Sequence, residues 1–211
     1  EALKKRVGPL AAELGTNIVL PCDVTDGASM DEVFATLKST WGGLDFLVHA
    51  IAFSDKNELD GRYLDTSEEN FTKTMQISCY SLTALARRAE PLMQDGSSIL
   101  TLTYYGAEKV MPHYNVMGVA KAALEASVRY LAVDLGGGNI RVNALLPGGT
   151  KTGMMGDDPA FHDYIASLHA LKRMAEPEEI ARAARFLLSD AGSFVTGSAM
   201  LCDGGNSIAK A

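Results

Sequence analysis

The sequence predicts an α/β fold built on a doubly wound parallel sheet, and two observations lead to this class. Helical and strand-like segments alternate along the 211 residues, with no linker, repeat or low-complexity stretch between them. Residues 44–50 form an apolar run that can be buried on both faces, which is typical of a parallel strand covered by helices on both sides. Right-handed crossovers between such strands give the doubly wound arrangement.

The composition fits one globular domain over residues 1–211. Hydrophobic residues make up 47% of the chain and charged residues 21%, and a chain of this length can bury a sizeable core. No apolar stretch is long enough to span a membrane, and residues 1–6 resemble an amphipathic helix more than a signal peptide, so we expect a cytoplasmic protein. The net charge of -7 argues against binding to nucleic acid or to anionic membranes.

The cysteines and histidines indicate neither a disulfide framework nor a metal centre. Cys22, Cys79 and Cys202 are odd in number and lack C-x-x-C spacing, so we interpret them as small buried hydrophobic residues. The histidines show no H-E-x-x-H or other ligand spacing, which favours structural roles for them. We therefore expect no metal site.

The helices are predicted from apolar residues at helical spacing and from capping signals at their ends. Gly15 ends the first helix, Ser67 and the two glutamates after it begin the third, and glycines at 136–138 end the fourth. Thr25 or Asp26 can cap the second helix. The expected helices span residues 2–14, 29–40, 68–90, 115–135 and 176–188.

The strands are predicted from short apolar runs between these helices. They span residues 17–22, 44–50, 98–103, 140–146 and 199–205, the last with its turn. Irregular segments follow two of these strands, at 50–66 and 147–152, and open α/β sheets bind ligands at the carboxyl ends of their strands. Residues 153–172, rich in Met, Asp and His, are expected to form a mobile, partly helical flap.

The stretch from Tyr104 to Lys121 carries the strongest chemical signal. Tyr114 and Lys121 are seven residues apart, so on one helix they lie on nearly the same face, about 10 Å apart. Tyr104 reaches the same region from the end of the preceding strand. A phenol and an ammonium could thus form one wall of a site. From spacing alone, a helix-capping tyrosine and a solvated lysine are an equally good interpretation.

Short motifs elsewhere in the chain follow one another in a recognisable order. They are Asp23-Val24, Leu47 to Phe53, Ile140 to Asn143, Pro147-Gly148 and Cys202 to Gly205. In this order they resemble the short-chain dehydrogenase/reductases over essentially the whole chain. The resemblance implies a Rossmann-like fold that binds a dinucleotide.

The spacing of the tyrosine selects a branch of that superfamily. Most members carry a tyrosine four residues before the lysine, but Met117 occupies that position here. The string from Tyr105 to Lys109 has the common spacing but lies outside the helix. Lys121 precedes Pro147 by 26 residues, which fits one helix and one strand, so Tyr114 becomes the reactive phenol. A Tyr-x6-Lys pair in this context is similar to the enoyl-acyl-carrier-protein reductases of bacterial fatty-acid synthesis.

That resemblance implies a role for each part of the site. Tyr114 stabilises the thioester oxygen of an enoyl substrate while NADH delivers hydride, Lys121 binds the nicotinamide ribose, and Tyr104 lines the substrate side. The other residues implied to bind NADH are Asp23, Val24, Ala50, Ile51, Ala52, Thr150 and Thr152. Those implied to form an adaptable acyl channel with Tyr104 are Met117, Met154, Met155 and Phe161.

Several of these assignments have a structural alternative. Core packing explains each channel residue equally well, and Asp23 can serve as a helix cap. The glycine-rich β-α-β unit that holds pyrophosphate is missing before residue 1, so we expect an N-terminally incomplete domain. Residues 145–152 and the last third of the chain are closer to general members of the superfamily.

Three functions from different classes follow. The first is an NADH-dependent enoyl-acyl-carrier-protein reductase, the second a reductase acting on a keto or hydroxy substrate, and the third a non-catalytic interaction module or inactive truncated chain. For the first, the resemblance implies a homotetramer and an acyl carrier protein with an enoyl chain as partner. Lys151, Lys172 and Arg173 flank the flap and could meet that acidic carrier.

Overall fold

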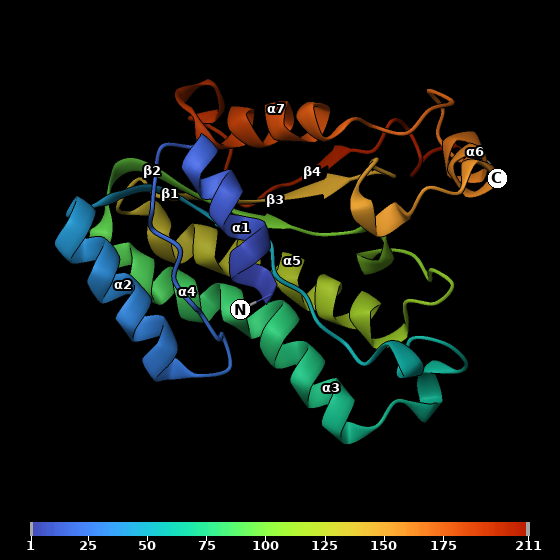
Figure 1. Ribbon diagram of the computed structural model, residues 1–211, viewed down its shortest axis with the longest axis horizontal. Coiled ribbons are helices and arrows are strands. Elements are labelled where there is room, and N and C mark those ends of the chain that lie inside the picture. Colours follow the sequence, from blue (N-terminus) through green and yellow to red (C-terminus); the bar gives the residue numbers. More distant parts are fainter. Residues whose placement is uncertain (1, 210–211) are drawn as a thin grey trace. The chain divides into compact units, whose positions relative to one another are not determined.

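A computed structural model describes the backbone of residues 2–209 and the side chains of residues 5–153 and 155–209 (Figure 1). The chain consists of two compact units, Glu1–Gly42 and Gly43–Ala211. The expectation of one domain over residues 1–211 stays a prediction, as does the expectation of a missing phosphate-binding unit.

The first unit contains the helices α1 (Ala2–Glu13) and α2 (Gly27–Trp41), which confirm the two predicted helices. The side chain of Asp26 caps α2 by accepting a hydrogen bond from the Ala28 N–H at 2.9 Å. The strand predicted at 17–22 is wrong, because this segment has no regular secondary structure. An apolar run becomes a strand only where a neighbouring strand supplies its hydrogen bonds, and no strand among the described residues pairs with this one.

The second unit is built, within the described residues, on a four-stranded parallel sheet of order β1-β2-β3-β4. The strands are β1 (Leu44–His49), β2 (Met93–Leu102), β3 (Arg141–Pro147) and β4 (Ala199–Cys202). The register places Leu100 opposite Val48 on one side and Asn143 on the other. The four predicted strands are confirmed, and their parallel direction brings their carboxyl ends to one edge.

Helices cover both faces of this sheet, as the doubly wound prediction requires (Figure 1). On one face α5 (Asn115–Gly136) packs on β3, and α4 (Ser81–Ala89) packs on β1. On the other face α7 (Pro177–Leu188) packs on β2 and β3. The remaining helices of this unit are α3 (Glu68–Met75) and α6 (Pro159–Ser167).

Alternation along the central strands divides the core into two layers. Ile99 and Val142 are fully buried in the cluster that faces α4 and α5. Leu100 and Leu145 point the other way and pack with Leu187 of α7. Each such side chain contributes roughly 1.5–3 kcal/mol by leaving water. Strands that are buried on both faces explain why these segments are continuously apolar rather than alternating in polarity.

The helix predicted at 68–90 is interrupted. Between α3 and α4 the chain forms a π-helical turn, η3 (Gln76–Tyr80). The Ser78 hydroxyl donates to the carbonyl of Phe53 at 3.0 Å and accepts from its N–H at 2.9 Å, which fixes the segment that follows β1. Such turns occur frequently at functional sites. Apolar spacing could not reveal this turn because the segments on both sides are α-helical.

A buried arginine at the start of β3 fixes the end of α7. Arg141 is 5% exposed and donates to the carbonyls of Leu187, Ser189 and Gly192. We expect Arg141→Leu to lower the free energy of unfolding by about 2–4 kcal/mol, because three carbonyls each lose the hydrogen bond from the buried guanidinium. Urea denaturation measures this free energy of unfolding. Arg185→Leu, an exposed control on α7, changes it by less than about 0.5 kcal/mol; equal effects would contradict this role.

Candidate functional site

The three residues predicted to be catalytic meet at the carboxyl end of β2. Tyr104 follows the strand by two residues, and Tyr114 is the N-cap residue of α5. Their rings pack edge to face, with centroids 4.9 Å apart and an interplanar angle of 66°. Lys121 lies two turns into α5, and its Nζ donates a hydrogen bond to the carbonyl of Leu102, the last residue of β2, at 2.7 Å. Strand end and helix together therefore form one site.

Burial shifts the ionisation of these groups. Lys121 is 6% exposed, and the loss of solvation lowers its pKa from 10.5 to about 8, although Glu125 and Cys79 favour the cation. Burial raises the pKa of Tyr114, and the neighbouring Tyr104 raises it further. Burial also raises the pKa of Tyr104. Both phenols are therefore proton donors at neutral pH, while the lysine is close to its titration point.

Two glycines allow the η5 turn (Tyr105–Ala107) to pack directly on α5. A Cβ atom at Gly106 would lie 2.5 Å from Cδ1 of Tyr114, and one at Gly118 would lie 2.8 Å from the Gly106 carbonyl oxygen. The Tyr114 ring therefore contacts a backbone surface that no larger residue could provide. Gly106 was not singled out by the sequence.

The backbone on either side of Tyr114 is held in the left-handed region. His113 has a φ of 58° and Asn115 a φ of 29°, values that residues with a side chain rarely adopt. The Asn115 amide donates to carbonyls within residues 58–61 at 3.2–3.4 Å, and His113 Nδ1 contacts the carboxylate of Asp60. Part of the predicted ligand-binding segment 50–66 thus fixes the turn that presents Tyr114.

A buried histidine joins β1 to the same region. The ring nitrogens of His49 lie 2.8 Å from the Thr101 hydroxyl and 2.7 Å from the Ser81 hydroxyl. Ser81 gives its own proton to the carbonyl of Ile77, so Nε2 of His49 donates to Ser81 and Nδ1 accepts from Thr101. Burial and the charge of Lys121 lower the pKa of His49 to about 4. The ring is therefore neutral and fully bonded, which agrees with the expected structural role.

The residues predicted to bind NADH occupy two places. Ala50, Ile51 and Ala52 follow β1, and Thr150 and Thr152 follow β3, so these five lie at the carboxyl edge of the sheet. The Thr150 hydroxyl donates to the carbonyl of Gly148 at 2.9 Å, and Thr152 is exposed.

Asp23 and Val24 belong to the first unit. The Asp23 carboxylate accepts from the hydroxyl and the N–H of Thr25 at 2.7 and 2.8 Å, and these bonds lower its pKa. Since Asp26 caps α2, Asp23 is not that helix cap. The role of Asp23 and Val24 in cofactor binding stays a prediction.

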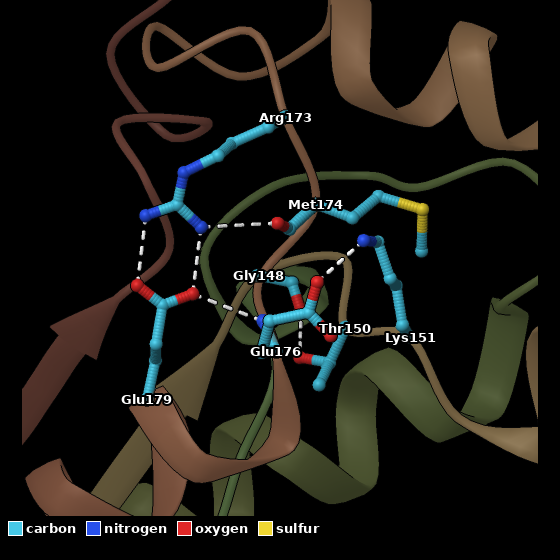
Figure 2. Close-up of polar contacts among 7 residues, drawn as sticks. All are labelled: Gly148, Thr150, Lys151, Arg173, Met174, Glu176 and Glu179. Atoms are coloured by element: carbon cyan, nitrogen blue, oxygen red, sulfur yellow. Dashed lines mark hydrogen bonds and ion pairs between the residues drawn. The ribbon is translucent and has the colours of Figure 1, made fainter.

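Ion pairs brace the segment after β3 (Figure 2). The N–H of Lys151 donates to the carbonyl of Ala175 at 3.0 Å, and its Nζ pairs with Glu176. Arg173 binds both carboxylate oxygens of Glu179, at 2.6 and 2.7 Å. Glu176 and Glu179 form the capping box of α7, which confirms the helix predicted over residues 176–188. Two of the three cations expected to meet a carrier protein are thus already paired within the chain.

The flap is partly helical, with η6 (Gly153–Met155) followed by α6. Phe161 is 41% exposed on α6 and Met155 is half-buried, while the side chain of Met154 lies outside the described residues. Met117 is 6% exposed within α5. The role of these residues as an acyl channel stays a prediction.

A cavity of about 350 Å³ lies beside Tyr114. Its walls come mainly from the end of η5, the loop that follows it and the start of α5. The lining residues are Tyr63, residues 106–111, Tyr114, Asn115, Gly118, Val119 and Ala122. None of the predicted channel residues with a described side chain belongs to this lining.

The described residues contain neither a cluster of metal-ligand side chains nor a helix suited to a membrane. Among them, no cluster of three or more His, Cys, Asp or Glu side chains could hold a metal ion. No helix in the same part of the chain is long and apolar enough to cross a membrane.

A doubly wound parallel sheet with a buried lysine and a tyrosine at its carboxyl edge is typical of the short-chain dehydrogenase/reductases. The family model described as enoyl-(acyl carrier protein) reductase matches residues 1–207. The chain belongs to that enoyl-(acyl carrier protein) reductase family.

Individual relatives agree with this assignment. The chain is 60% identical to enoyl-[acyl-carrier-protein] reductase [NADH] 1 of Rhizobium meliloti, over 97% of this chain and 76% of the relative. It is 54% identical to the NADH enoyl-[acyl-carrier-protein] reductase of Rickettsia bellii, over 99% of this chain and 80% of the relative. Each relative is therefore longer than this chain.

Solved structures give the same result. The chain resembles the Anaplasma phagocytophilum enoyl-acyl-carrier-protein reductase in complex with NAD, with a TM-score of 0.90 and 53% identity over 100% of this chain and 80% of the other. It resembles the NADH enoyl-acyl-carrier-protein reductase of Aquifex aeolicus with a TM-score of 0.93 and 40% identity, over 100% and 84% of the two chains. Both confirm the predicted fold class.

The packing of η5 on α5 gives a stability prediction. Gly118→Ala places a methyl group against the Gly106 carbonyl, so we expect the free energy of unfolding to fall by about 1–3 kcal/mol. Gly136→Ala is the matched control on the same helix, because a Cβ there meets nothing within 4 Å. It should be neutral or stabilise by up to about 1 kcal/mol. Equal urea midpoints for both variants would show that the close approach does not matter.

Proposed function

We propose that this chain reduces the enoyl double bond of thioesters borne by acyl carrier protein, with hydride from NADH, in fatty-acid synthesis. The observation that carries the proposal is the convergence of Tyr104, Tyr114 and Lys121 at the carboxyl end of β2. Family membership supports it, as do relatives, 45–60% identical, that are named NADH enoyl-acyl-carrier-protein reductases. The Anaplasma relative, solved with NAD, supports the choice of cofactor.

The carboxyl edge of the sheet fits a dinucleotide. Ala50 and Ala52 are small and exposed, so a flat ring can approach the backbone after β1. Thr150 and Thr152 follow β3, and their hydroxyl groups can form hydrogen bonds with a carboxamide or a phosphate. Lys121 carries ammonium protons beyond the one given to Leu102, and these can bind ribose hydroxyls. NADH, when bound, supplies the hydride.

The tyrosines and the lysine act on the charge that develops in the substrate. Hydride addition to the β-carbon moves negative charge to the thioester oxygen, and the protonated phenol of Tyr114 can donate a hydrogen bond to it. The ammonium of Lys121 favours the same charge through space. Tyr104 packs against the edge of the Tyr114 ring and limits its motion. A proton then adds to the α-carbon and completes the reduction.

We further propose a cytoplasmic homotetramer. Exposed apolar side chains on α5 support assembly through this helix, since Tyr130 is 77% and Val133 80% exposed. Tyr80, just before α4, is 59% exposed. Light scattering of the purified protein would give the number of chains directly.

The role of Tyr114 has a direct test. We expect Tyr114→Phe to lower kcat/KM for NADH-dependent reduction of crotonyl thioester by roughly 10²–10³-fold, because the oxygen loses its donor. NADH affinity, measured by fluorescence, stays unchanged. Tyr130→Phe, an exposed tyrosine on the same helix, serves as the control and keeps full activity.

Acetoacetyl thioester separates this function from the reduction of a ketone. Turnover of acetoacetyl thioester without turnover of crotonyl thioester would contradict the proposed reaction. Tyr114→Phe activity within twofold of the parent would contradict only the role of the phenol.

The carrier protein gives a separate prediction. Lys172 donates to the carbonyl of Ser167 rather than to a carboxylate, so its charge is available to an acidic partner. We expect Lys172→Glu to raise KM for carrier-borne enoyl substrate several-fold and to leave the free thioester unaffected. Lys38→Glu, an exposed change on α2, is the control. Equal changes for the two substrates would exclude a carrier contact at Lys172.

A further inference from the structure

Lys121 is held in surroundings that disfavour its charge. The side chain is 6% exposed, and one ammonium proton is given to the Leu102 carbonyl. A carbonyl dipole only partly replaces the water that a buried ammonium loses. The proposed function needs the charged form at the end of β2. Some other group must therefore favour protonation.

Glu125 lies one helical turn beyond Lys121 on α5, at the i+4 position that places two side chains on one face. It is 9% exposed, so its carboxylate is also largely removed from water. Its Oε1 accepts a hydrogen bond of 2.6 Å from the hydroxyl of Thr103, which is 4% exposed. This bond fixes the position of the carboxyl group. Glu125 is not used in the mechanism above.

The end of β2 fixes both members of this pair. Leu102 binds the ammonium through its carbonyl, and the next residue, Thr103, binds the carboxylate through its hydroxyl. The N–H of Thr103 donates to the carbonyl of Leu145 at 2.9 Å, so the strand end itself is fixed by β3. The positions of the two charges are thus set by adjacent residues of one ordered backbone.

The other ionisable groups that act on Lys121 are neutral. Cys79 on η3 faces it, but burial raises the pKa of that thiol. His49 on β1 faces it too, and its ring is neutral and fully bonded. Among the described residues, Glu125 is the carboxylic acid that favours the Lys121 cation; Cys79 favours it only as a thiolate, a form that burial disfavours.

We propose that Glu125, held by Thr103, is a positioning residue that keeps Lys121 protonated at the end of β2. It touches neither substrate nor cofactor and acts through the lysine. The inference rests on the proposed function, in which the lysine works as a cation. This role accounts for the burial of Glu125, because an acid is rarely buried in a protein core without a partner.

The direct test is an NMR titration of the lysine side chains, with the Lys121 signal assigned from Lys121→Met. We expect Glu125→Gln to lower the Lys121 midpoint from about 8 by about one pH unit. Glu125→Asp keeps the charge, so its Lys121 midpoint stays closer to that of the parent. Glu69→Gln, an exposed change on α3, leaves the midpoint unchanged. An unchanged midpoint in Glu125→Gln overturns the inference whether or not the chain is active.

The same variants give a kinetic readout that a packing role would not produce. Since the cation is the active form, kcat/KM falls as pH rises through the Lys121 midpoint. Glu125→Gln is then about fivefold less active than the parent at pH 8 and nearly equal to it at pH 6. A loss of the same size at both pH values means that Glu125 only packs. Inactivity of the parent toward crotonyl thioester would instead refute the proposed function.

Should Glu125→Gln fail to fold, Thr103→Val tests the same link. It leaves the acid in place but removes its hydrogen bond, so the carboxylate is less well fixed. A Lys121 midpoint below that of the parent supports the inference, and one equal to it overturns it.

Discussion

The hydrogen bond from Lys121 to the Leu102 carbonyl joins the helix that carries the site to the strand that ends there. The site depends on this link because the sheet is parallel, and parallel sheets of this kind bind ligands at the carboxyl ends of their strands. Around it, Tyr104 extends from the strand end and Tyr114 from the start of the helix, and their rings meet. A shift of α5 along β2 would separate the phenol, the ammonium and the strand end together.

Close backbone packing keeps that arrangement in place. Gly106 and Gly118 let the η5 turn approach α5, and Asn115 ties the turn before the helix to residues 58–61. His113 and Asn115 adopt unfavourable backbone angles on either side of Tyr114, which side-chain contacts with the same segment offset. Rigid placement of a phenol suits catalysis by a preplaced hydrogen-bond donor, because little reorganisation is needed when charge develops.

Much of this could be predicted from the sequence. Strands buried on both faces are continuously apolar, so residues 44–50 and 140–146 were identified correctly. Counting from Pro147 selected Lys121 over Lys109, and the structure places Lys121 inside α5 with Lys109 before it. The last third, which was closer to general superfamily members, nevertheless falls within the family match over residues 1–207.

The errors and omissions have physical causes. Residues 17–22 have the composition of a strand, but composition does not supply a hydrogen-bonding neighbour. The π-helical turn at Gln76–Tyr80 depends on contacts with Phe53 that local spacing does not encode. The pairing of Arg173 with Glu179 and the neutral state of His49 likewise follow from tertiary contacts.

Transfer of deuterium from stereospecifically labelled NADH to crotonyl thioester tests the central claim most directly. Mass spectrometry and NMR of the product locate the label. A saturated thioester with deuterium on its β-carbon is the predicted result, since the site is arranged to stabilise charge on the thioester oxygen after hydride reaches that carbon. A product without deuterium at the β-carbon, or NADH that is not consumed, would contradict the account.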